Sequence, residues 1–255
     1  MLPTPSTSHV NYDQVYEPAE DSYLLLDTLS SASETAFLQR RFPQHATSPL
    51  VVEIGPGSGV VLAFVTAHAG RIFARRNVGT LGVDVNPVAC AATRQTVQTA
   101  SASARADCGV FLDAVNGDLT TAIKPGSVDV LIFNPPYVPS ESLPSLPVHD
   151  EHDAADARGS FARDSHLLSL STDGGIDGME ITNRLLAQLD VALSARGVAY
   201  ILLCAQNKPE IVMAQVRAWP TRDASMLRWN VEKVASSGRK AGWEKLCVIR
   251  IWSDR

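Results

Sequence analysis

A short apolar run that leads through glycines into a helical pattern constrains the fold of this chain more than any other feature. Residues Leu50–Ile54 are mostly apolar and partly β-branched, three glycines follow within 55–59, and Val60–Ala69 has apolar residues at helical spacing. Strands buried in parallel sheets have such continuous apolar sequences, and glycine allows a sharp turn into the next helix. We therefore expect a parallel sheet covered by helices.

The same alternation continues along the chain and predicts seven strands in all. Helices are expected over Glu20–Leu38, Pro87–Ala100, Met179–Leu193 and Pro209–Trp219, and Arg40–Pro49 is expected to be a linker. The other strands are expected over Thr80–Val85, Gly109–Val115, Ser127–Phe133, Val198–Cys204, Leu227–Val234 and Glu244–Ile251. The last two strands flank Ser-Ser-Gly at 236–238, which suits an antiparallel hairpin. The prediction is an α/β fold with a doubly wound, mostly parallel sheet and ligands at the carboxyl ends of its strands.

The length of 255 residues is compatible with one large α/β domain. The proline-rich residues 1–15 are expected to be flexible, and residues 16–255 to form a single domain. The regular pattern stops after Tyr137, where prolines and the acidic stretch Asp150–Asp156 predict a surface insertion at about 140–166.

Charge and cysteine usage limit the classes of function. The formal net charge of −5 offers no global positive field for a phosphate backbone, which disfavours a dedicated nucleic-acid scaffold. The four cysteines lie far apart and lack metal-ligand spacing, so we expect no metal in this chain. Neither a signal peptide nor a long apolar run is present, which predicts the cytoplasm, with the nucleus as a second location, and no membrane association.

The turn after the first strand indicates an adenosine site. Residues Glu53–Gly59 have the pattern E-x-G-x-G-x-G, and Val60 stands where a dinucleotide fingerprint requires glycine. Asp84 ends the second strand, where a carboxylate can accept both ribose hydroxyls. Asp118 follows the third strand and suits an adenine amino group. A pocket for adenosine without pyrophosphate fits S-adenosylmethionine.

The most specific motif is Asn134-Pro135-Pro136-Tyr137, at the end of the fourth strand. Two prolines fix the backbone and supply no N–H, so the Pro135 carbonyl can face the pocket beside the Asn134 side-chain oxygen. Two adjacent acceptors match the two hydrogens of an NH2 group, and Tyr137 offers a flat face for an amide or a base. The predicted catalytic residues are Asn134, Pro135 and Tyr137, and the predicted substrate-binding residues are Asn134, Pro135, Pro136, Tyr137 and Val138.

The two acceptors compensate for the weak nucleophilicity of an amide or aromatic amine nitrogen. The lone pair of an amide or aromatic amine nitrogen is delocalised, and holding both hydrogens turns that lone pair toward the methyl donor. Because the proton can leave after methyl transfer, no strong general base is required. We expect most of the acceleration to come from positioning, which is worth ~7 to 11 kcal/mol for well-oriented reactants.

In this order, the motifs resemble those of the HemK-type glutamine N5-methyltransferases. Residues Tyr16–Ser22 and the three leucines that follow at 24–26 resemble the N-terminal motif of the short eukaryotic and archaeal branch. The resemblance implies a class I S-adenosylmethionine-dependent methyltransferase fold of Rossmann-like type and places Ser22 at the methionine end of the cofactor. Gly174–Gly178 resembles the family's glycine segment. Together these motifs predict the cofactor residues Ser22, Glu53, Gly55, Gly57, Asp84, Asp118, Leu119 and Asn134.

The resemblance also implies a substrate and a partner. Members of the family methylate the Gly-Gly-Gln loop of translation termination factors. Members of this branch act as catalytic subunits of heterodimers with a small zinc-binding activator, which adds to the sheet edge at the third strand. Any zinc would then belong to the partner.

Other interpretations remain open at this point. The same tetrapeptide would serve an adenine or cytosine methyltransferase, although such an enzyme needs a basic groove or a recognition domain. Lysine methylation and a non-catalytic module with this fold are further alternatives. Three further features are expected to have no part in binding or catalysis. They are the acidic loop with His149, Asp150, Glu151, His152 and Asp153, the solvated arginines Arg71, Arg75 and Arg76, and the core or hairpin tryptophans Trp219, Trp229, Trp243 and Trp252.

Overall fold

The computed structural model describes residues 2–145, 157–220, 228–238 and 245–253, and its centre is a seven-stranded sheet in the order β3-β2-β1-β4-β5-β7-β6. The strands are β1 Leu50–Ile54, β2 Gly79–Asp84, β3 Val110–Asn116, β4 Val128–Phe133, β5 Leu193–Cys204, β6 Trp229–Ser236 and β7 Leu246–Ser253. Strands β1 to β5 pair in parallel, and β7 pairs antiparallel with both β5 and β6. The predicted doubly wound sheet with a C-terminal antiparallel hairpin is confirmed.

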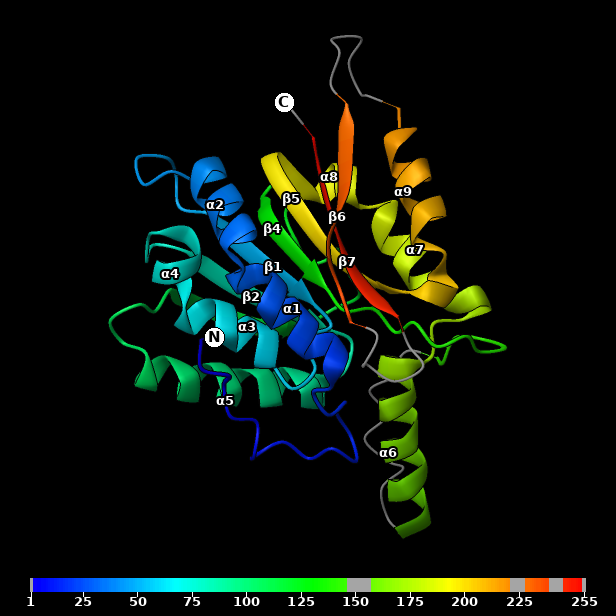
Figure 1. The fold of residues 1–255 in the computed structure, drawn as a ribbon. Helices are drawn as coiled ribbons and strands as arrows, with labels where there is room; N and C mark the ends of the chain where they lie inside the picture. Colours follow the sequence, from blue (N-terminus) through cyan, green and yellow to red (C-terminus); the bar gives the residue numbers. More distant parts are fainter. Residues whose placement is uncertain (1, 146–156, 221–227, 239–244, 254–255) are drawn as a thin grey trace.

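Helices cover both faces of the sheet (Figure 1). Their bounds are α1 Glu20–Ser30, α2 Ala32–Arg41, α3 Val60–Ala67, α4 Ala69–Phe73, α5 Pro87–Ser103, α6 Ala157–Thr172, α7 Glu180–Leu186, α8 Leu189–Ala192 and α9 Pro209–Arg217. Short 3-10 turns lie at Ile176–Gly178 (η1) and Ala205–Asn207 (η2). Within the described ranges, no helix combines the length and the apolar character needed to cross a membrane.

Alternate residues of the central strands fill two separate cores. Val51 and Val130 belong to the core under α1 to α4, whereas Val52 and Leu131 belong to the core under α7 to α9. All four side chains are fully buried. Because both faces are covered, the central strands carry apolar residues on both faces, which explains why their sequences are mostly continuous apolar runs rather than alternating patterns.

Two helices that were predicted as continuous are divided. The first predicted helix, over Glu20–Leu38, breaks at Ser31, whose backbone is extended and whose side chain caps α2 by accepting from the Glu34 N–H at 3.3 Å. Serine favours this role because its hydroxyl satisfies a free helical N–H. The predicted helix over Met179–Leu193 is divided into α7 and α8, and the chain continues directly into β5.

The region predicted as an insertion at about 140–166 contains the start of a regular helix. Residues 146–156 lie outside the described ranges, and α6 runs from Ala157 to Thr172. Among the described side chains of α6, Leu167 alone is fully buried. Much of the helix extends away from the rest of the molecule (Figure 1), although Leu167 and Leu170 line the cavity at the ends of the parallel strands. The apolar stripe by which a packed helix is identified is therefore short.

The N-terminal residues, predicted to be flexible over 1–15, pack on α5 where they are described. Val10 and Val15 are buried and form a small cluster with Ala89. The Gln14 carbonyl accepts a hydrogen bond from Asn86 Nδ2 at 2.9 Å. The domain limits, with residues 16–255 as a single unit, stay a prediction.

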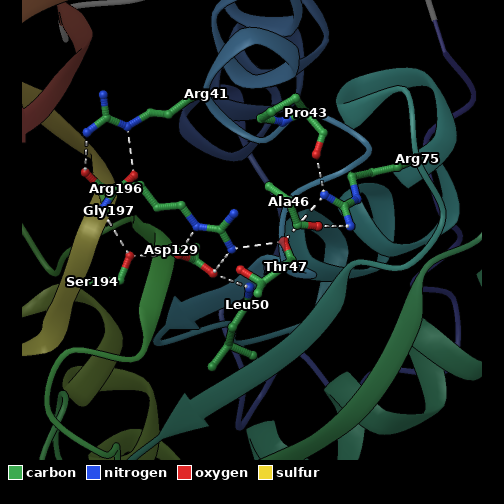
Figure 2. A network of polar contacts seen from close by, with 10 residues as sticks. All are labelled: Arg41, Pro43, Ala46, Thr47, Leu50, Arg75, Asp129, Ser194, Arg196 and Gly197. Carbon is green, nitrogen blue, oxygen red and sulfur yellow. Dashed lines mark hydrogen bonds and ion pairs between the residues drawn. The ribbon is translucent and has the colours of Figure 1, made fainter.

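A buried carboxylate joins the starts of three strands at the end of the sheet opposite the strand carboxyl termini. Asp129 accepts from the Leu50 N–H at 3.0 Å, from Ser194 Oγ at 2.6 Å, and from Arg196 Nε and Nη2 at 3.0 and 3.1 Å. Figure 2 shows these contacts linking β1, β4 and β5. Since its donors lie in β1 and β5 and Asp129 itself lies in β4, Asp129 fixes the relative placement of these three strands.

Replacing Asp129 by alanine should destabilise the fold without altering ligand affinity. The substitution leaves Arg196 and the Leu50 N–H without their partner, which costs about 2 to 4 kcal/mol of unfolding free energy. Urea denaturation measures the loss. The exposed pair of Arg71 and Asp107 supplies the control, because Arg71→Ala should change stability little. Equal effects of the two substitutions would contradict the assignment.

Candidate cofactor and substrate site

A cavity of about 480 Å³ lies at the carboxyl ends of the parallel strands. Its volume is in the range of small-molecule sites, and its position is the usual ligand position in such sheets. All predicted cofactor and substrate residues line it, namely Ser22, Glu53, Gly55, Gly57, Asp84, Asp118, Leu119, Asn134, Pro135, Pro136, Tyr137 and Val138. The fold therefore brings these residues together, and their individual roles stay predictions.

The glycines after β1 have different structural tasks. Gly55 and Gly57 have φ angles of 62° and 54°, in the left-handed region that favours glycine. A Cβ built on Gly55 has no neighbour within 4 Å, so this turn leaves room for a ligand beside its backbone. A Cβ on Gly59 would lie 2.6 Å from Thr93 Cα, so Gly59 is needed for the close approach of α3 and α5.

Asp84 is a buried carboxylate held by the glycine loop. Its Oδ2 accepts from the Gly57 N–H at 3.1 Å and its Oδ1 from the Asn86 N–H at 2.8 Å. Burial raises the pKa of Asp84 to about 6, although these hydrogen bonds act in the opposite direction. A carboxylate oxygen has more than one acceptor site, so both oxygens can still accept from a diol.

Glu53 brings a second buried acid to the same cavity. Its side chain is 2% exposed, and no described residue donates to its Oε2. Burial raises the pKa of Glu53 well above its usual value, and the nearby charge of Asp84 adds to the rise. A buried carboxylate oxygen without a donor is costly, so the site suits a ligand that brings hydrogen-bond donors or positive charge. The ammonium group and the ribose hydroxyls of S-adenosylmethionine have this chemistry.

Asp118 has a partner that the sequence did not reveal. Its Oδ2 pairs with Arg184 Nη2 of α7, and both residues line the cavity. Leu119, next to it, is 5% exposed and has a φ angle of 51°, so this turn is tight and packed. The ion pair engages Oδ2, so Oδ1 is the oxygen that the prediction assigns to an amino group.

The Asn134 side chain has an unusual hydrogen-bonding state. Its Nδ2 donates to Asp21 Oδ2 at 3.0 Å, whereas its Oδ1 is buried and receives no hydrogen bond from the described residues. Asp21 is 3% exposed and comes from α1, so sequence analysis missed the contact. A buried amide oxygen at the wall of a cavity is a prepared acceptor for an incoming N–H.

Glycines 174 and 178 explain how the tetrapeptide is held in place. A Cβ on Gly178 would lie 2.0 Å from the Tyr137 carbonyl oxygen, and a Cβ on Gly174 would lie 2.5 Å from that of Pro136. The Gly174 N–H also donates to the Val138 carbonyl at 2.8 Å. Only glycine permits this close approach, which accounts for the glycine segment noted in the sequence.

Of the three arginines expected to be solvated, one has a structural role instead. Arg75 is 6% exposed, and its guanidinium donates to the carbonyls of Pro43 and Ala46 at 2.8 and 3.0 Å (Figure 2). The prediction is therefore wrong for Arg75, which ties the segment after α2 to the turn before β2. Arg71 and Arg76 are exposed, as expected.

The tryptophans that are described pack as predicted. Trp219 and Trp229 meet edge to face with ring centroids 5.2 Å apart, and Trp252 meets Phe37 at 5.5 Å. Trp243 and the acidic loop at 149–153 lie outside the described residues, so the predictions for them stay predictions.

Comparisons with known proteins place the chain among enzymes. It is 31% identical over 257 residues to the eRF1 methyltransferase catalytic subunit mtq2 of Schizosaccharomyces pombe, spanning 99% of this chain and 96% of that protein. It is 32% identical to the methyltransferase HEMK2 of Mus musculus, over 98% and 96% of the two chains. The solved Mtq2-Trm112 complex from E. cuniculi has a chain of the same fold, with a TM-score of 0.52 at 22% identity over 93% and 98% of the two chains. No protein-family model matches.

The raised pKa of Asp84 predicts opposite effects of pH on ligand affinity and on stability. Ribose hydroxyls need the ionised acceptor, so the affinity for S-adenosylhomocysteine should be roughly tenfold weaker at pH 5 than at pH 7. The folded-state pKa of about 6 exceeds the ordinary value of 3.8, so this group's contribution to stability is lost as pH rises between those values.

Calorimetric titration and urea denaturation across this pH range measure the two effects. The substitution Asp84→Asn should remove the part of each pH dependence that Asp84 causes. Identical slopes in the wild type and the variant would contradict the role of Asp84, because Glu53 would then account for all of the dependence.

Proposed function

Because this chain belongs to the family of HemK-type protein glutamine N5-methyltransferases, we propose that it methylates the glutamine of the Gly-Gly-Gln loop in a translation termination factor. The donor is S-adenosylmethionine, and the chain acts as the catalytic subunit of a heterodimer. The relative from Schizosaccharomyces pombe is named as an eRF1 methyltransferase catalytic subunit, which supports both the substrate and the subunit role.

The observation that carries the proposal is the buried Oδ1 of Asn134, to which no described residue donates. A glutamine side chain ends in a planar NH2 group with two hydrogens, so it needs two acceptors at a fixed angle. Asn134 Oδ1 is the first, and the Pro135 carbonyl is the second. Tyr137 supplies a flat face for the amide plane. With both hydrogens held, the nitrogen lone pair turns out of resonance and toward the methyl donor.

The cavity residues fit the cofactor by charge and by shape. Glu53 and Ser22 bind the methionine end, Asp84 holds the ribose hydroxyls, and Asp118 with Leu119 holds the adenine. The turn at Gly55 leaves space for the cofactor against the backbone. S-Adenosylmethionine supplies an electrophilic methyl group on a sulfonium. The chain itself orients the nucleophile, and the amide proton is released to solvent after the transfer.

The substitution Asn134→Ala should abolish methyl transfer and leave cofactor binding nearly intact. It removes one of the two acceptors at the reacting nitrogen, for which we expect a loss in kcat on the order of 100- to 1000-fold. Mass spectrometry of a purified termination factor detects the gain of one methylene on the loop glutamine, and calorimetry with S-adenosylhomocysteine measures binding.

Unchanged turnover in the Asn134→Ala variant would refute the role of the acceptor pair. A parallel assay with DNA tests the main alternative. Methyl label that appears in DNA and not in the termination factor would favour a base methyltransferase and overturn the proposal.

The edge of the sheet supports the partner that we propose. Strand β3 is one of the two edge strands of the sheet, with its outer edge unpaired among the described residues, and Val110 and Leu112 are 53% and 55% exposed. An exposed strand edge with apolar side chains is a docking site for another chain. The solved complex of the E. cuniculi relative contains Trm112 as its second component. We propose that a small zinc-binding activator of this kind covers β3, and that the zinc belongs to it.

The substitution Leu112→Lys should prevent heterodimer formation, because it places a charge in the apolar part of the interface. Co-expression with the activator, followed by affinity capture and light scattering, measures the association. Ile211→Lys on α9 is the matched control, since Ile211 is 54% exposed and lies away from β3. Equal capture of both variants would contradict the proposed interface.

The cellular location and the domain bounds that we propose are those predicted from the sequence. We place the enzyme in the cytoplasm, with the nucleus as a second compartment, and we take residues 16–255 as one methyltransferase domain.

Glutamine is the proposed acceptor. Lysine would require loss of a proton before attack, a step that the acceptor pair does not provide.

A further inference from the structure

The hydrogen bond between Asp21 and Asn134 connects the start of α1 to the end of β4, 113 residues further along the chain. We propose that Asp21 is a positioning residue that locks the Asn134 amide with its oxygen toward the substrate. The inference rests on the proposed function, since it concerns how the acceptor for the glutamine NH2 group is prepared. It adds a residue outside the predicted site, because neither the tetrapeptide nor the cofactor motifs include Asp21.

The carboxylate of Asp21 is itself held in one orientation. Its Oδ1 accepts from the Ser22 N–H at 2.6 Å and from Ser22 Oγ at 3.2 Å, which leaves Oδ2 for Asn134 Nδ2 at 3.0 Å. Helix α1 is anchored by Leu25 and Leu29, which are 0% and 1% exposed. The carboxylate therefore belongs to a rigid element, and its 3% exposure keeps water from competing for the bond.

An asparagine amide has two ends of nearly equal shape and opposite hydrogen-bonding character. A carboxylate accepts and does not donate, so only the Nδ2 end of Asn134 can face Asp21. This choice turns Oδ1 away from Asp21, and Oδ1 is buried and without a partner among the described residues, in a side chain that lines the cavity. In the reversed orientation, Asn134 would present an NH2 group to the substrate NH2 group, and two donors would face each other.

The substitution Asp21→Asn tests the proposal with almost no change of shape. The new amide keeps its oxygen on the Ser22 N–H and turns its NH2 group toward Asn134, whose amide then reverses. We expect kcat for a Gly-Gly-Gln substrate to fall on the order of 100-fold. The affinity for S-adenosylhomocysteine should stay within about twofold, because Glu53, Asp84 and Asp118, which hold the cofactor, are unchanged.

A specificity measurement separates reorientation from simple damage. With S-adenosylhomocysteine present, the affinities of a Gly-Gly-Gln peptide and of the matching Gly-Gly-Glu peptide are measured for each form of the full chain with its activator. The wild type should prefer the glutamine peptide. Asp21→Asn should shift the ratio of the two affinities toward the glutamate peptide, because the reversed Asn134 offers a donor. Damage to the fold would weaken both peptides without changing their ratio.

A reciprocal exchange of the two side chains provides a rescue. Asn134→Asp alone sets two carboxylates against each other and should lose activity. Combined with Asp21→Asn, the new amide donates to one carboxylate oxygen at position 134 and leaves the other as an acceptor in the cavity. The double variant should turn over at least about tenfold faster than either single variant, a coupling expected of two residues in direct contact.

Asp27→Asn is the matched control, since Asp27 is exposed on the same helix and its substitution should leave kcat unchanged. Near wild-type kcat and an unchanged peptide ratio in Asp21→Asn would overturn the inference, as would a double variant no faster than the single ones. These failures leave the proposed function intact, because that function depends on the separate result for Asn134→Ala.

Discussion

One hydrogen bond links helix α1 to the end of β4 at the cavity, and the preparation of the site depends on it. Asp21 binds the nitrogen of the Asn134 amide, and the amide oxygen is left buried with no donor in the part of the chain that the structure describes. A buried acceptor in this state is costly to the folded protein, so the surrounding structure must hold it. Helix α1 holds it from one side. From the other side, Gly178 packs so closely on the Tyr137 carbonyl that no side chain would fit between them.

The same cavity contains two further polar groups whose state is unfavourable without a ligand. Burial raises the pKa of both Glu53 and Asp84, because the charged form of each carboxylate is less stable in the buried site than it would be in water. Raised pKa values of this kind are typical of functional sites, where groups are arranged to bind a ligand rather than to stabilise the fold. The opposite end of the sheet differs, because each oxygen of Asp129 there has protein donors.

The sequence was sufficient for the sheet and for bringing the motif residues to the cavity. Strands such as Leu50–Ile54 are covered on both faces, so their apolar character is local and visible, and parallel strands bring their carboxyl ends together whatever the details of packing. Contacts between distant residues were not predictable. Asp21 with Asn134 and Arg184 with Asp118 are pairs from separate elements. Helix α6 was missed because little of it is buried.

The proposed pair of acceptors is tested most directly by a crystal structure of the chain, with its activator, bound to S-adenosylhomocysteine and a Gly-Gly-Gln peptide. We expect the glutamine side-chain nitrogen to lie within hydrogen-bond distance, ~2.7 to 3.2 Å, of both Asn134 Oδ1 and the Pro135 carbonyl oxygen. A glutamine amide bound elsewhere, or an Asn134 amide whose nitrogen faces the peptide, would contradict it.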